Sequence, residues 1–156
     1  MRYGFWNDIY SLREDAEDEG YLEDIDFSFM DGGLHSHGYN TYNFLHGCCN
    51  EFADYLHRTY GYKVMAILEH GQLIHMYCET DSGYIDIRGV CDDFEEFMQD
   101  FTDNGLWENS DCTVIREYKK IPAKYRASED GLKAAAAMDQ EYGYYDPYIY
   151  EWLKAA

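Results

Sequence analysis

Three residues of the chain, Cys49, His75 and Asp86, have the types and the order of a nucleophilic catalytic triad. A cysteine sulfur attacks carbonyl carbons, a histidine takes up and returns the thiol proton, and an acidic side chain orients the imidazole. The acyl group of an amide or ester then passes through a thioester to water or to an amine. These residue types therefore predict hydrolysis or acyl transfer, if the fold brings them together.

A helix is expected to carry the cysteine. The residues after Cys49 repeat apolar side chains at helical spacing, at Phe52, Ala53, Leu56 and Tyr60, and Gly61 suits the C-terminal cap. The free N–H groups and the dipole at a helix N-terminus favour a thiolate, so we expect a lowered pKa for Cys49.

Three strand-like runs follow, over residues 63–68, 73–78 and 84–88, with turn signals at His70–Gly71 and at 81–83. In the last two runs apolar and polar side chains alternate, which predicts an antiparallel hairpin with one buried face. A turn at 81–83 would bring His75 close to Asp86.

These residues resemble a known family. The segment 47–53 (GCCNEFA) is similar to the nucleophile segment of papain-like cysteine peptidases, and His75-x10-Asp86 resembles the histidine and aspartate strands of their transglutaminase-like branch. Small uncharacterised proteins of phages and mobile elements belong to this branch. The resemblance covers residues 43–101, which we take as the candidate catalytic core.

The resemblance implies Cys49 as nucleophile, His75 as base and Asp86 as the orienting acid. It also places Asn43 where the family has a glutamine that donates to the oxyanion together with the Cys49 N–H. Asn43 departs from that pattern by one methylene. Cys48 precedes the nucleophile and is the alternative nucleophile, although the spacing to the aromatic residue at 52 favours Cys49.

The remaining elements complete an α+β fold in one domain, residues 1–156. We expect an acidic helix in the first thirty residues, a loop over 30–40, a strand over 113–118 and a helix over 128–138. Asp92 is the predicted cap of a helix with an apolar face at Phe94, Phe97, Met98 and Phe101. In the tail, Asp146 is a candidate cap before Pro147.

Composition excludes several functions. Twelve Lys and Arg against 31 Asp and Glu leave a net charge of −19, which disfavours direct binding to nucleic acid or anionic membranes. Five cysteines without regular spacing indicate free thiols in a reducing cytoplasm. We expect no cofactor. His35 and His37, with His46 nearby, are the weak alternative of a metal site.

The acidic residues also allow a non-enzymatic function. Between Arg88 and Arg116 the chain has eight acidic residues and no Lys or Arg. Such a segment is either a solvated surface or a mimic of nucleic-acid phosphates. The partner is therefore a protein substrate or a basic protein. The alternative to the enzyme is an acidic inhibitor of the phage type that binds a basic surface of a host defence protein.

Overall fold

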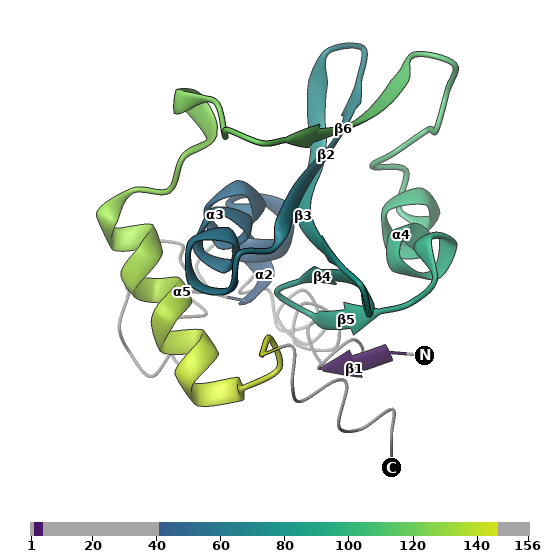
Figure 1. Ribbon diagram of the computed structural model, residues 1–156. Coiled ribbons are helices and arrows are strands. Elements are labelled where there is room, and N and C mark those ends of the chain that lie inside the picture. Colours follow the sequence, from purple (N-terminus) through teal and green to yellow (C-terminus); the bar gives the residue numbers. More distant parts are fainter. Residues whose placement is uncertain (1, 5–40, 147–156) are drawn as a thin grey trace, which may run out of the picture.

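The structure, a computed structural model, describes residues 2–4 and 41–146 and has the expected α+β class, with four α-helices and a six-stranded antiparallel sheet in that part of the chain (Figure 1). In chain order the elements are β1 (Arg2–Gly4), α2 (Thr41–His46), α3 (Cys49–Tyr60), β2 (Lys63–Glu69), β3 (Gln72–Thr80), β4 (Gly83–Asp86), β5 (Gly89–Cys91), α4 (Phe94–Asp103), β6 (Thr113–Tyr118), the 3₁₀ helix η2 (Ala123–Tyr125) and α5 (Glu129–Tyr142). The strand order is β1-β5-β4-β3-β2-β6. The predicted N-terminal helix, the 30–40 loop and Pro147 lie outside the described residues.

Tight turns set the register of the central strands. Glu69 faces Gln72 across a two-residue turn, in which His70 and Gly71 have φ values of 51° and 77°. Positive φ at both central residues matches the right-handed twist of the flanking strands. The next hairpin pairs Thr80 with Gly83. Both turns lie where the sequence predicts them.

The third strand is shorter than predicted. The expected run 84–88 ends as β4 at Asp86, and the chain turns at residues 87–88 before pairing again as β5. Gly89 makes this return possible because its Cα lies opposite Asp86 and Gly4, and a Cβ there would come within 1.9 Å of the Tyr3 carbonyl oxygen.

Helices α3 and α4 cover opposite faces of the sheet (Figure 1). On the α3 face, the Cys78 thiol approaches the Ala53 carbonyl at 3.4 Å. On the other face, the rings of Tyr77 and Phe97 lie 5.1 Å apart. The prediction of a single buried face is therefore wrong, because the apolar stripe of α4 buries the face that carries the polar residues of the alternation.

Caps define the helix ends. Helix α4 is capped by Asp93, which accepts a hydrogen bond from the Glu96 N–H at 2.9 Å, and not by the predicted Asp92. Gly61 ends α3 in the left-handed region at φ 76°, as predicted. The Ser128 hydroxyl caps α5, which continues four residues beyond the predicted end at 138.

Helix α5 packs on the outer side of α3. The hydroxyls of Tyr55 and Tyr60 both donate to one carboxylate oxygen of Asp139. Nearby, the Asn50 amide donates to the Tyr125 carbonyl at 2.8 Å. These bonds attach the C-terminal part of the chain to the helix that begins at Cys49, so they help to hold that helix in place.

Candidate active site

The structure brings His75 and Asp86 into direct contact. The two strands place them diagonally across the β3–β4 hairpin, and His75 Nε2 lies 2.9 Å from Asp86 Oδ2. His75 is fully buried and Asp86 is 3% exposed. A buried carboxylate and imidazole at this distance form a strong hydrogen bond, as the turn at 81–83 led us to expect.

Arg88 completes a buried network that sequence reasoning missed. Its Nη2 lies 2.7 Å from Asp86 Oδ2, and its Nε contacts both carboxylate oxygens at 3.1 and 3.2 Å. The guanidinium also donates to the Phe97 carbonyl and stands 5.0 Å from the Phe97 ring centre. Asp86 and Arg88 stand two positions apart in the sequence, and this was the only signal that could have paired them.

The network explains the charge states of its members. Burial raises the pKa of Asp86, but the Arg88 charge and the hydrogen bonds from His75 and Arg88 outweigh it and leave the pKa below its usual value. Burial lowers the pKa of His75, and Arg88 adds to this effect against the opposing influence of Asp86. The ground state is therefore an Asp86–Arg88 ion pair beside a neutral imidazole.

The hydrogen bond to Asp86 decides the tautomer of His75. An ionised carboxylate can only accept hydrogen bonds, so Nε2 carries the proton and Nδ1 has the free lone pair. No hydrogen bond from the described residues reaches Nδ1, although it is buried. Leaving a buried acceptor without a donor costs about 1–3 kcal/mol, so this nitrogen calls for an explanation.

Cys49 begins α3, and its sulfur contacts β3 at Met76, the residue after His75. Its sulfur accepts a hydrogen bond from the Met76 N–H at 3.4 Å, and the residue is 7% exposed. The negative charge of Asp86 is close enough to raise the pKa of the thiol. In the described part of the chain, however, Cys49 and His75 form no direct hydrogen bond.

The thiol of Cys49 is protonated at neutral pH, contrary to the expectation from its place at a helix start. Burial raises its pKa to about 11, more than the N–H groups of Met76 and Asn50 lower it. The pKa of the half-buried Cys48 is also raised to about 11, by burial and then by the Glu51 carboxylate. The dipole of a helix end does not overcome the loss of hydration.

Asn43 has a structural contact that the sequence does not indicate. It lies in α2, and its main-chain carbonyl accepts hydrogen bonds from the N–H groups of Gly47 and Cys48 at 2.8 and 2.5 Å. These bonds close the tight connection between α2 and α3. The Cys48 N–H is thus already hydrogen-bonded. Asn43 is half-buried and lies close to the start of α3.

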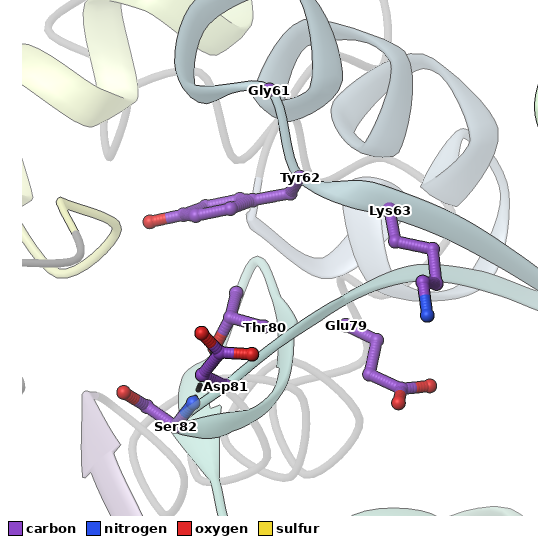
Figure 2. Close-up of a pocket in the computed structure, with 7 residues that line it drawn as sticks. All are labelled: Gly61, Tyr62, Lys63, Glu79, Thr80, Asp81 and Ser82. Atoms are coloured by element: carbon purple, nitrogen blue, oxygen red, sulfur yellow. Dashed lines mark hydrogen bonds between the residues drawn. The ribbon is translucent and has the colours of Figure 1, made fainter.

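The surface hollow shown in Figure 2 is separate from these residues. It has a volume of about 470 Å³ and lies between the start of β2 and the β3–β4 turn. Its lining residues are Gly61, Tyr62, Lys63, Glu79, Thr80, Asp81 and Ser82. Figure 2 shows the Tyr62 ring on one side and the turn residues on the other. Cys49, His75 and Asp86 do not line the hollow.

Two further sequence expectations concern metals and membranes. His35 and His37 lie outside the described residues. Within residues 2–4 and 41–146, no group of three or more His, Cys, Asp or Glu side chains is placed to hold a metal ion. None of the helices in these two segments combines the length and the apolar character needed to cross a bilayer.

Comparison with known proteins adds no relative. The chain matches no protein-family model, no curated protein and no solved structure.

Proposed function

We propose that the protein is a cysteine-dependent hydrolase or acyl-transfer enzyme of papain- and transglutaminase-like character, which acts on a protein substrate through Cys49, His75 and Asp86. The observation that carries the proposal is that the two ring nitrogens of His75 differ in their hydrogen bonds. Nε2 is hydrogen-bonded to Asp86, and the buried Nδ1 has no partner among the described residues. A triad needs this arrangement, because one nitrogen must be oriented while the other remains free to accept the thiol proton.

The raised pKa of Cys49 defines how the thiol would be activated. A neutral thiol and a neutral imidazole react by general-base catalysis, for which the Cys49 thiol must come within hydrogen-bond reach of His75 Nδ1: the Cys49 proton moves to His75 Nδ1 as the sulfur–carbon bond forms. His75 is then an imidazolium that Asp86 stabilises through Nε2. It returns the proton to the leaving amine as the carbon–nitrogen bond breaks and the thioester forms.

Water or an amine then attacks the thioester carbonyl and loses a proton to His75 Nδ1. The carbon–sulfur bond breaks as His75 returns this proton to the Cys49 sulfur, which regenerates the thiol. Water gives a peptidase or deamidase and an amine gives a transglutaminase. The Cys49 N–H and Asn43 remain the proposed donors to the oxyanion. Because Cys49 is only 7% exposed, a substrate must displace the groups around the start of α3 to reach the sulfur.

Covalent labelling tests the proposal. Cys112 is exposed and would react non-specifically, so the experiment uses a Cys112→Ser background. Biotinylated peptide vinyl sulfones that differ in the residue before the electrophile are added, and the adduct is located by mass spectrometry. We expect the adduct at Cys49. Cys49→Ala should abolish it, and the matched control Cys48→Ala should retain it.

The pH profile of labelling separates a triad from an isolated thiol. The reaction rate of an isolated thiol with a pKa near 11 increases about tenfold with each unit of rising pH, until the pH reaches that pKa. A base-assisted thiol instead follows the neutral form of His75, so its rate levels off above a pKa that lies below 6.5. A rate that rises steadily to pH 10, or labelling at Cys48 in place of Cys49, would contradict the proposal.

The acidic surface of α4 supports a second candidate, the non-enzymatic inhibitor that binds a basic protein. A hollow of about 540 Å³ on this surface is lined by Asp93, Glu95, Glu96, Gln99, Thr102 and Asn109. Screening by salt would weaken such binding strongly, while Cys49→Ala would leave it unchanged. Isothermal titration with a basic partner protein at two salt concentrations measures both properties.

A further inference from the structure

Strand β6 has one edge along which no described strand pairs. It pairs with β2 in the register Val64↔Tyr118 to Glu69↔Thr113, and it is the last strand in the order of the sheet. No other strand in the described part of the chain lies along its second edge. A strand edge of this kind presents N–H and C=O groups that can pair with another polypeptide.

The register identifies the groups on the free edge. Glu69 and Gln72 flank a two-residue turn, so the backbone groups of Glu69 point toward β3 and those of its neighbour His70 point toward β6. The His70 N–H accordingly donates to the Cys112 carbonyl. Along β6 the even-numbered residues therefore bond to β2, and Ile115 and Glu117 direct both backbone groups outward. Thr113 contributes only its carbonyl to this edge, because its N–H donates to the Ser110 carbonyl at 3.0 Å.

The side chains beside this edge are apolar and accessible. Val114 is 54% exposed and Ile115 is 45% exposed, and they lie on opposite faces of β6. Two exposed β-branched residues at a sheet edge favour contact with a neighbouring strand, whose side chains would cover them on both faces.

Positive charge is concentrated at the same place. Five of the twelve Lys and Arg residues lie within residues 116–126, together with a single acidic residue, Glu117; the five are Arg116, Lys119, Lys120, Lys124 and Arg126. All five are exposed, and none forms an ion pair with another described residue. The segment 116–126 thus carries a net charge of +4 in a protein whose total is −19.

The end of this segment folds back toward the strand. The rings of Tyr118 and Tyr125 are 6.1 Å apart. The Arg116 guanidinium lies 5.0 Å from the Tyr118 ring centre, and the Lys124 ammonium lies 4.9 Å from that of Tyr125. We call β6 together with residues 119–126 the basic edge.

We propose that the basic edge is a docking site for an extended acidic segment of another polypeptide, which adds to β6 as a seventh strand. The outward N–H and C=O groups of Ile115 and Glu117, together with the Thr113 carbonyl, would hold its backbone, and the basic side chains would select acidic residues. A second copy of β6 fits poorly, because edge-to-edge pairing would bring two segments of charge +4 together. A nucleic acid fits poorly as well, since it offers no backbone that completes the strand pairing.

Fluorescence anisotropy with the full-length protein tests the proposal. The probe is a labelled eight-residue peptide that alternates valine and glutamate. The first control peptide alternates proline and glutamate, with the same charge but without the N–H groups that pairing needs. The second control peptide alternates valine and lysine. The third control is a single-stranded oligonucleotide whose charge matches that of the valine–glutamate peptide.

The valine–glutamate peptide should bind at least about tenfold more tightly than the proline–glutamate peptide, and raising the salt to several hundred millimolar should weaken binding at least about tenfold. Lys119→Glu should weaken binding, and Lys133→Glu, which changes an exposed lysine in α5, should not. Equal binding of the two acidic peptides, preference for the oligonucleotide or the basic peptide, or no binding at low salt would overturn the proposal.

Discussion

The Asp86–Arg88 pair allows a quantitative test of what holds His75 in place. Asp86→Asn keeps the shape of the side chain and removes its charge, while Arg88→Met keeps an unbranched side chain that can pack on the rings of Phe97 and Phe101. Each single change leaves one charge of the pair buried without its counter-ion. The double variant removes both charges.

The burial sets the magnitudes. Asp86 is 3% exposed and Arg88 is fully buried, so each single variant should lose about 3–5 kcal/mol of unfolding free energy. Asp100 lies 3.6 Å from Arg88 Nη1 and moderates the loss in Asp86→Asn. The double variant should lose less than the sum of the two by at least about 2 kcal/mol, because no unpaired charge remains.

Arg88→Met has a pH signature of its own. Without the guanidinium, the carboxylate of Asp86 has only His75 as an ionisable partner, so the pKa of His75 is lowered less than in the unchanged protein. A lowered histidine pKa costs stability as the pH falls below the unfolded pKa of about 6.5, because the unfolded state then binds the proton more strongly, and Arg88→Met reduces this cost. The loss caused by Arg88→Met should therefore be smaller at pH 5.5 than at pH 8.

Urea unfolding, followed by tryptophan fluorescence and far-ultraviolet circular dichroism at both pH values, measures all four proteins. The reasoning is refuted if the two single losses simply add, with a coupling below about 0.5 kcal/mol. It is also refuted if Arg88→Met loses as much stability at pH 5.5 as at pH 8.

Two other predictions follow from the structure. Glu69→Gln should lower the urea midpoint at pH 7 but not near pH 2. Hydrogen bonds, led by that from the Ser110 N–H, lower the pKa of Glu69 from 4.5 to about 2, so the stabilisation is present above pH 4.5 and disappears as the pH falls through about 2. An equal difference in midpoint at both pH values would contradict this. Gly83→Ala should cost more than about 3 kcal/mol of unfolding free energy in thermal or urea unfolding, because a Cβ at φ 144° would lie 2.4 Å from the Cys91 carbonyl oxygen. Gly71→Ala, at φ 77° with no atom within 4 Å, should cost only about 1–2 kcal/mol. Similar losses for the two variants would contradict the geometry.

Local patterns predicted much of the sheet and of the helix that carries Cys49. The turn signals at 70–71 and 81–83 set the strand register, and that register brings His75 to Asp86. Gly61 marks the end of α3 because a left-handed cap is a local property of the chain. Features within a few residues of one another can be inferred in this way, since turn geometry and side-chain period act over short distances.

Residues that are distant in sequence decided the environment of the candidate site. The period-two pattern assigned His75 and Asp86 to an open face, but the apolar stripe of α4 covers that face and buries both. Burial at the start of α3 likewise leaves Cys49 as a neutral thiol, against the expectation from its helix start. Periodicity reports which side chains share a face, whereas hydration depends on what packs against that face.

For this protein, then, the sequence by itself determined the α+β class, the positions of the hairpins and the His75–Asp86 proximity, because these depend on local turns and alternation. Only the tertiary structure decided that Arg88 neutralises Asp86 inside the protein and that the free nitrogen of His75 is buried. Both results depend on the loss of water when α4 packs on the sheet. Desolvation is a property of the assembled fold.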